Sequence, residues 1–213
     1  GVATYSLGVG GYCPIVREGV AAVSSQAFAN PWLGKTAMRL LESSDSPETV
    51  LEKLQADDPH FEFRQVGIVA HSGRAACHTG ANTRAKRGHV LGDGYVAMGN
   101  VLGNDAVVRE MAAAFESSEG RELEERLLKA LEAGRAAGGQ GHLNERSAAL
   151  IVSPLDGSDM GVDLRVDVHQ SAVEEIRRVW SEYRPYREYY NLRANQPHLT
   201  PPQEQWARQN KGR

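Results

Sequence analysis

The sequence predicts an α+β fold in which two packed sheets carry helix pairs on their outer faces, a four-layer αββα sandwich. Two observations support this prediction. Strand patterns follow one another in hairpins and helix patterns follow one another in pairs, whereas a doubly wound sheet needs the two to alternate. The expected order is two strands, two helices, three strands, two helices, two strands and one helix.

The first third of the chain is predicted to contain the first two strands and the first two helices. Residues 1–7 alternate small, apolar and hydroxyl side chains, and the glycine-rich stretch 8–11 ends this pattern as a turn. The apolar stretch 19–26 is a candidate buried strand. Apolar side chains then recur at helical spacing, at Ala37, Leu40 and Leu41 and again at Val50, Leu51 and Leu54. Ser46 can cap the second helix, with Pro47 at its first position.

The middle of the chain returns to strands. Residues 63–70 and 74–80 form a predicted hairpin around a turn at Ser72 and Gly73. Residues 90–98 are a predicted third strand, which a turn-like pair at 93–94 interrupts. These segments supply the three strands in the middle of the predicted order.

The following segments complete the domain. Asn104 can cap a helix. The next helix carries a stripe of leucines, at Leu123, Leu127, Leu128 and Leu131. Strands are predicted at 147–153 and 162–167, joined by a turn at 156–157, and the second of them alternates apolar and charged side chains as a half-buried strand does. A final helix begins at about Ser171.

The C-terminal residues differ in character from the rest, so residues 1–182 are expected to form one domain and residues 183–213 an arm. The arm is rich in aromatic residues and proline, namely Tyr183, Tyr186, Tyr189, Tyr190, Pro197, Pro201, Pro202 and Trp206. Tyrosine and tryptophan are enriched at protein interfaces. The arm is therefore expected to lie across its own surface or a neighbouring subunit, and to join copies of the chain into a homo-oligomer.

Composition and charge exclude several classes of protein. The chain has 213 residues, of which 41% are hydrophobic and 24% charged, as in globular proteins. With 24 Lys and Arg against 27 Asp and Glu, the net charge of −3 provides no basic excess for binding nucleic acid. No apolar run is long enough to cross a membrane, the two cysteines are too few for a disulfide scaffold, and no histidines pair at metal-ligand spacing. We therefore expect a cytoplasmic protein without a metal or a cofactor.

Polar side chains collect where predicted strands end. Ser25 and Asn30 close one strand, His78 and Thr79 close another, and Asn100 follows a third. Loops at strand ends often carry binding and catalytic residues, which makes these five candidate site residues. Each of them could instead be a turn residue or a helix cap.

Asp163, Arg165 and Asp167 lie on one face of the last predicted strand, because side chains alternate along a strand. An arginine between two acids can hold an anionic substrate group, which makes Asp163 and Arg165 candidate substrate-binding residues. The same pattern also occurs on solvated sheet faces and in charge ladders between strands, so this alternative stays open.

Several short segments occur in a specific order along the chain. They are GVA at 1–3, GVAAVSSQA at 19–27 with Asn30 and Pro31, QVGIV at 65–69, HTG at 78–80, GYVAMGN at 94–100, Gly138 with Gly139, SAAL at 147–150 and VDLRVD at 162–167. From residue 1 to about residue 180 the chain thereby resembles the bacterial family catalogued as domain of unknown function 1028 (DUF1028), which is grouped with the N-terminal nucleophile (Ntn) hydrolases. The resemblance implies an αββα sandwich of the Ntn-hydrolase type, in agreement with the order of elements.

The resemblance also implies an amidohydrolase that acts on a small amide, lactam or ureido substrate. In Ntn hydrolases the first residue of the processed chain is Thr, Ser or Cys, whose side chain attacks the carbonyl while its own α-amine takes the proton. An α-amine has a pKa of about 7.7–8.0, so it can act as a base without a histidine. Family members place a short strand with this residue before the segment that matches residues 1–3. The nucleophile is therefore expected upstream of Gly1.

Site roles follow from the resemblance and from the strand-end positions. Asn100, His78 and Ser6 are candidate catalytic residues, with Asn100 as the donor to the oxyanion and Ser6 lining the pocket. Candidate substrate-binding residues are Ser25, Asn30, Thr79, Asp163 and Arg165. The alternative function is a non-catalytic small-molecule-binding or assembly protein that keeps the same fold.

Overall fold

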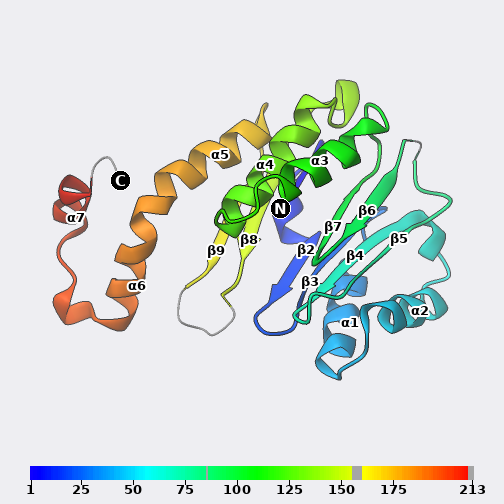
Figure 1. Cartoon of the computed structure of the whole chain (residues 1–213), viewed down its shortest axis with the longest axis horizontal. Coiled ribbons are helices and arrows are strands. Elements are labelled where there is room, and N and C mark those ends of the chain that lie inside the picture. The colour runs from blue at the N-terminus through cyan, green and yellow to red at the C-terminus, as the bar shows by residue number, and fades with distance from the viewer. Residues whose placement is uncertain (85, 155–159, 211–213) are drawn as a thin grey trace.

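The described residues of the computed structural model, 1–84, 86–154 and 160–210, form a mixed α+β fold with three antiparallel sheets (Figure 1). Sheet A contains β1 (Val2–Thr4), β8 (Ser147–Val152) and β9 (Val162–Val166), in that order. Sheet B contains β2 (Pro14–Arg17), β3 (Ala21–Ala27), β4 (Arg64–Ala70) and β5 (Ala75–Thr79), in that order. Sheet C is the hairpin of β6 (Gly88–Gly92) and β7 (Tyr95–Gly99). The predicted turn at 156–157 lies outside the described residues.

Several helices begin where the sequence supplies a capping side chain. The helices are α1 (Pro31–Glu42), α2 (Pro47–Asp57), α3 (Ala106–Glu116), α4 (Leu123–Ala136), α5 (Ala172–Tyr183), α6 (Arg187–Asn195) and α7 (Gln203–Gln209). Asn30 accepts a hydrogen bond from the first turn of α1 at 3.1 Å, and Ser46 does so for α2 at 3.2 Å. Asn104 accepts from the first residue of α3 at 2.8 Å.

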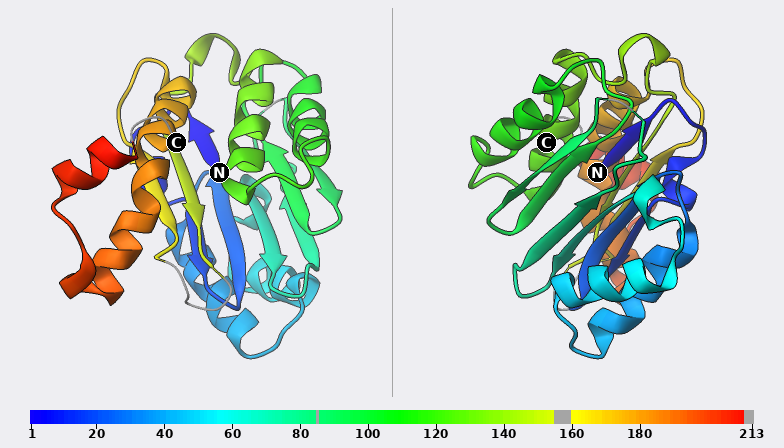
Figure 2. Two further views of the ribbon diagram at one scale, coloured as in Figure 1. Left: turned by 60° about the vertical axis from the view of Figure 1, so that its left-hand side comes forward. Right: turned by 90° about the vertical axis from the view of Figure 1, so that its right-hand side faces the viewer.

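Each sheet is covered by its own helices. Helices α1 and α2 pack on sheet B, α3 packs on sheet C, and α5 packs on sheet A (Figure 2). Sheet C lies against sheet B, with β7 next to β4 and β6 next to β5. Gly67 permits this close approach, because a Cβ atom at that position would lie 3.0 Å from the sulfur of Met98 on β7.

The structure corrects three details of the predicted elements. Residues 90–98 were predicted as one interrupted strand, but they belong to the β6–β7 hairpin, which turns at Gly94 with a φ of 70°. An Asp-Gly pair between apolar residues favours this type of turn. The strand β2 was missed, because it is short and begins with Pro14. The first strand is also shorter than predicted and ends at Thr4.

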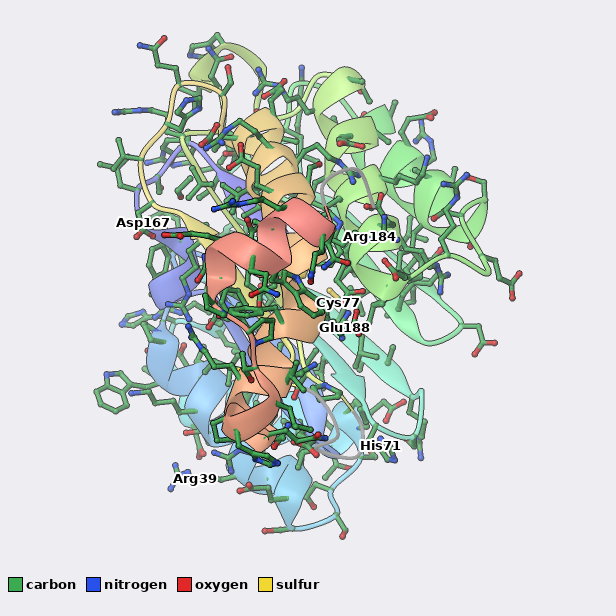
Figure 3. The ribbon with its side chains drawn as sticks, turned by 90° about the vertical axis from the view of Figure 1, so that its left-hand side faces the viewer. Arg39, His71, Cys77, Asp167, Arg184 and Glu188 are labelled. Atoms are coloured by element: carbon green, nitrogen blue, oxygen red, sulfur yellow. The ribbon has the colours of Figure 1, made fainter. Side chains whose placement is uncertain are left out.

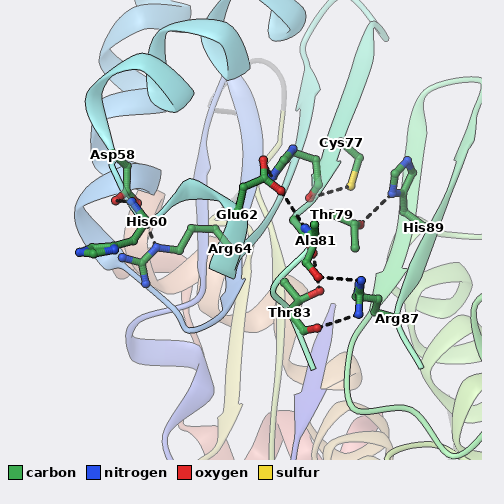
Figure 4. A network of polar contacts seen from close by, with 12 residues as sticks. Asp58, His60, Glu62, Arg64, Cys77, Thr79, Ala81, Thr83, Arg87 and His89 are labelled. Carbon is green, nitrogen blue, oxygen red and sulfur yellow. Dashed lines mark hydrogen bonds and ion pairs between the residues drawn. The ribbon is translucent and has the colours of Figure 1, made fainter. Parts of the chain in front are cut away.

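The Asp58–Arg64 ion pair joins the end of α2 to the start of β4 and gives a pH-dependent prediction. Asp58 Oδ2 lies 2.9 Å from Arg64 Nε, and Oδ1 accepts from the His60 backbone at 2.9 Å (Figure 4). Burial alone raises the pKa of Asp58, but these hydrogen bonds outweigh it and hold the pKa below its ordinary value. The stabilisation is therefore present above the unfolded pKa of about 3.9 and is lost as the pH falls through the lower folded value.

We expect Asp58→Asn to lower the free energy of unfolding by about 2 kcal/mol at pH 7, because a charge-assisted hydrogen bond is lost. Urea denaturation of wild type and variant near pH 7 and near pH 3 measures this difference. A stability loss that is equally large at both pH values would show that the Asp58 charge does not stabilise the fold.

The arm extends beyond α5 and folds back on itself, as Figures 1 and 3 show. The Tyr189 hydroxyl donates to the Pro201 carbonyl at 3.2 Å, and the Tyr189 and Trp206 rings lie 5.5 Å apart. Arg187 Nη1 contacts Glu124 of α4 at 2.9 Å. In its described part the arm is thus mainly helical, and it contacts the domain through at least one ion pair.

Candidate functional site

A groove of about 570 Å³, here called the central groove, lies between sheets A and C. It is lined by β1 and β8 of sheet A, β7 of sheet C, β2 and β3 of sheet B, and α3 and α4. Much of its surface is apolar and includes Ala22 of β3, Ala97 of β7, and Leu127 and Leu131 of α4. This volume lies within the range of about 300–1,000 Å³ that small-molecule sites occupy.

Two strand edges border the central groove. Among the described residues, β1 pairs only with β8, and β7 pairs only with β6. All residues of β1 and β7 line the groove. A free strand edge presents backbone N–H and C=O groups that can pair with a further extended segment. The groove therefore offers backbone hydrogen-bonding groups from two strands.

One part of the groove lining is a set of uncharged polar side chains, here called the polar cluster. Its members are Tyr5, Ser6, Tyr12, Cys13, Ser24, Gln26, Asn100 and Gln140. The Cys13 sulfur lies 3.2 Å from Ser24 Oγ, and burial raises the pKa of the Cys13 thiol to about 11. Cys13 is therefore protonated at neutral pH and is a poor nucleophile in this state. Burial likewise raises the pKa of Tyr12.

Asn100 is fixed in the polar cluster from two sides. Its Nδ2 donates to Gln65 Oε1 at 3.2 Å, and its backbone carbonyl accepts from Gln140 Nε2 at 3.2 Å. Gln140 Oε1 in turn accepts from the Tyr5 backbone at 2.7 Å, which ties the end of β1 to this site. The carboxamide of Asn100 has two N–H groups, so one remains to donate to a molecule in the groove.

The residue after Asn100 has a strained backbone. Val101 has a φ of 55°, in the left-handed region that β-branched residues avoid. Such conformations cost about 1–3 kcal/mol and occur preferentially at functional sites. The strain accompanies the sharp change of direction after β7, where Asn100 lines the groove.

Gln65 organises the polar side chains beneath the groove. Its side chain is 0% exposed, and its Oε1 accepts from Gln26 Nε2 at 2.7 Å as well as from Asn100. Its Nε2 donates towards Thr79 Oγ1 at 2.9 Å. Sequence reasoning placed Gln26 among the polar residues at a strand end but gave it no role in the site. It gave Gln65 no role either, although a glutamine at the start of an apolar strand was a usable signal because buried polar side chains need partners.

The structure places the predicted site residues in different parts of the molecule. Ser6 and Asn100 line the central groove. Ser25 is fully buried and donates to the Asn30 carbonyl at 3.1 Å, while Asn30 caps α1. Thr79 Oγ1 accepts from Gln65, whose Oε1 in turn accepts from Asn100, so Gln65 links Thr79 to Asn100. Their roles in binding or catalysis remain predictions.

His78 also lies away from the groove lining. Its ring stacks on Phe61 with 4.3 Å between ring centroids, and its Nε2 lies 3.8 Å from Glu62 Oε1. That nitrogen is buried and has no hydrogen-bond partner among the described residues. A catalytic role would require the His78 ring to contact the groove, and His78 is not among the described residues that line it.

Asp163 and Arg165 lie on the outer face of β9, as the alternating pattern predicted. Arg165 donates to both oxygens of Asp163, at 2.7 and 2.8 Å, and neither residue is among the described residues that line the groove. This bidentate pair already satisfies the carboxylate. A substrate anion would have to compete with Asp163 for the guanidinium group.

The described residues contain no group of three or more His, Cys, Asp or Glu side chains that could hold a metal ion. None of the helices in the described ranges is sufficiently long and apolar to span a bilayer.

The chain is similar to known proteins in sequence and in structure. A family model described as "Family of unknown function (DUF1028)" matches residues 1–176. The crystal structure of protein SPO2555 from Silicibacter pomeroyi, which carries the same DUF1028 family model, is similar with a TM-score of 0.77. It shares 27% sequence identity over 85% of this chain and 80% of that chain. No curated protein matches this chain.

Proposed function

The chain belongs to the DUF1028 family, and on this premise we propose that it is an amidohydrolase of the N-terminal nucleophile type. The proposed substrate is a small amide, lactam or ureido compound. The observation that carries the proposal is the polar cluster in the central groove, where Asn100 presents a carboxamide donor beside free strand edges. We further propose that the complete arrangement of sheets and helices is the four-layer αββα sandwich of this superfamily.

The proposed nucleophile is a Thr, Ser or Cys on an extended segment upstream of Gly1. The free edges of β1 and β7 support a position for this segment in the central groove, where it would pair with one or both strands. Its side-chain oxygen or sulfur attacks the substrate carbonyl, and its own α-amine takes the proton. The protonated amine then gives this proton to the leaving nitrogen, and water hydrolyses the acyl-enzyme to release the acid.

Asn100 supplies the electrostatic part of the proposed mechanism. The attacked carbonyl oxygen becomes negative, and a fixed N–H donor stabilises that charge more than it stabilises the neutral substrate. Gln65 and Gln140 hold the carboxamide and the backbone of Asn100, so little reorganisation is needed. The uncharged side chains of the polar cluster can hydrogen-bond a neutral amide or ureido group, and the charged Glu145 and Arg135 that also line the groove pair with each other at 2.9 Å.

A second candidate function is non-catalytic binding of a small molecule in the same groove. It is favoured by the protonation of the two thiols, because burial raises the pKa of Cys13 to about 11 and that of Cys77 to about 12. Neither thiol is an activated nucleophile. The proposed catalysis therefore uses the upstream residue and not a thiol of the described residues.

The test is to trap the acyl-enzyme. The full encoded protein is incubated with a panel of small amides, lactams and ureido compounds, quenched in acid and analysed by intact-mass and peptide mass spectrometry. The proposal expects an acyl adduct on the first residue and turnover that is lost when this residue is changed to Ala. Saturable binding without adduct or turnover across the panel would favour the binding protein.

We also propose that the arm joins copies of the chain into a homo-oligomer. The Tyr190 ring lies 5.8 Å from the Tyr183 ring, in a tilted contact, and stacks on the Tyr186 ring at 6.0 Å between centroids. These rings lie on a segment that extends beyond the domain (Figure 1). Leu199 is 60% exposed on the same segment. Aromatic side chains on a projecting element are typical of subunit contacts.

Deleting residues 184–213 should therefore lower the oligomeric state, because the aromatic contacts between copies are removed. Multi-angle light scattering of the full chain and the truncated chain measures the mass per particle. Circular dichroism confirms that the domain remains folded. A folded truncated protein that keeps the oligomeric state of the full chain would show that the arm packs within one copy.

A further inference from the structure

Gln65 connects the central groove to the edge strand β6 through consecutive hydrogen bonds. Asn100 donates from Nδ2 to Gln65 Oε1 at 3.2 Å, and Gln65 donates from Nε2 to Thr79 Oγ1 at 2.9 Å. Thr79 Oγ1 lies 2.8 Å from Nδ1 of His89 on β6 (Figure 4). Consecutive hydrogen bonds therefore connect the His89 ring to the Asn100 side chain.

The chemistry of the groups fixes the direction of the first of these bonds. A carboxamide nitrogen can only donate, so Thr79 Oγ1 accepts from Gln65. The direction of the second bond depends on the tautomer of His89: when the proton of the neutral imidazole lies on Nε2, Nδ1 accepts from the Thr79 hydroxyl.

Protonation of His89 changes this arrangement. Nδ1 becomes a donor, so the Thr79 hydroxyl hydrogen must turn to a different acceptor. Gln65 Nε2 also lies 3.1 Å from the carbonyl oxygens of both Gly88 and Gly99. Its two hydrogens can thus be redistributed among three acceptors, and the Gln65 amide can respond to the change at Thr79.

We propose that Gln65 is a positioning residue for Asn100, and that Thr79 couples the orientation of the Asn100 carboxamide to the protonation state of His89. The proposal rests on the proposed function, in which Asn100 donates to the oxyanion. Neutral His89 with its proton on Nε2 accepts the hydroxyl hydrogen of Thr79, and Gln65 then holds Asn100. Protonation of His89 breaks the hydrogen bond that the Thr79 hydroxyl donates to it and weakens the hydrogen bond between Gln65 and Asn100. The site is therefore active at neutral pH and less active in acid.

The surroundings of His89 favour its neutral form. Partial burial and the charge of His78 on β5 both lower the pKa of His89. Glu62 lies beyond His78, and Arg87, two residues before His89, is bound to backbone carbonyls.

Val90 packs with α3 on the opposite face of β6. The charged residues of that helix are Arg109, Glu110 and Glu116.

The experiment is an NMR titration of the full chain, labelled with ¹³C and ¹⁵N, from about pH 5 to about pH 8, where histidine titrates. It follows the His89 ring and the Asn100 side-chain amide in wild type, Thr79→Val and Thr79→Ser. In wild type the Asn100 amide should shift with the same midpoint as His89, and neutral His89 should carry its proton on Nε2. The Asn100 shift should be lost in Thr79→Val, which lacks the hydroxyl, and should return in Thr79→Ser.

An Asn100 amide that does not follow His89 in wild type would overturn the proposal. An equally large shift in Thr79→Val would do the same, because the coupling would then bypass the hydroxyl. The measurement needs no turnover. A protein that shows the coupling but hydrolyses none of the substrates in the panel would contradict the proposed function and leave this inference standing.

Discussion

Replacing Asn100 by Ala should lower turnover by ~10²–10³-fold, the usual effect of removing one oxyanion donor. The side chain lines the groove and is held by Gln65, so the variant removes a positioned N–H group and leaves the apolar part of the groove in place. Turnover should fall far more than substrate affinity, because the donor acts on charge that develops only in the transition state. Steady-state kinetics of purified, folded protein measures both quantities.

Asn104→Ala is the matched control. Asn104 lies four residues later and accepts from the first residue of α3 at 2.8 Å, and it is not among the described residues that line the groove. The variant removes this cap and the hydrogen bond from Asn104 Nδ2 to the Ala137 carbonyl, so it should cost at least about 1 kcal/mol of stability and leave turnover per folded molecule unchanged. Wild-type turnover in a folded Asn100→Ala variant would remove Asn100 from the mechanism.

Trp180→Ala should destabilise the fold by about 3–5 kcal/mol, the usual cost of truncating a buried aromatic side chain. Trp180 is 1% exposed and packs between α5 and sheet A, in the same core as Leu128, Leu150 and Ile176. Its Nε1 also donates to Glu125 Oε1 at 2.7 Å. The variant therefore leaves a cavity and removes one donor from the Glu125 carboxylate.

Trp180→Phe separates these two effects. It keeps an aromatic ring in the core but loses the N–H donor and part of the ring volume, so it should cost less than Trp180→Ala. Chemical denaturation of wild type and both variants at equal protein concentration gives the two differences. Equal losses for Phe and Ala would show that the hydrogen bond, rather than packing, dominates at this position.

The elements that local chemistry determines could be predicted from the sequence. Ser46 and Pro47 defined the start of α2 because a hydroxyl cap and a proline at the first position favour a helix start in any context. The alternation of β9 was also predicted, since one face of that strand is buried and the other exposed. The family resemblance rested on an ordered set of segments, and the family model confirms it over residues 1–176.

What depends on contacts between distant segments could not be predicted. The pairing of β1 with β8 joins residues from opposite ends of the domain. Gln65 was part of a family segment but was not predicted as a site residue, because its partners Gln26, Thr79 and Asn100 come from three different strands or strand ends. A satisfied buried amide is visible only once the strands that surround it are placed.

The most direct test of the account is the N-terminal sequence and intact mass of the native, untagged protein. The proposed mechanism predicts a segment upstream of Gly1 whose first residue is Thr, Ser or Cys with a free α-amine. That residue would then be the one to replace by Ala. A native protein whose first residue has no nucleophilic side chain would contradict the Ntn-hydrolase proposal and favour a binding function for the central groove.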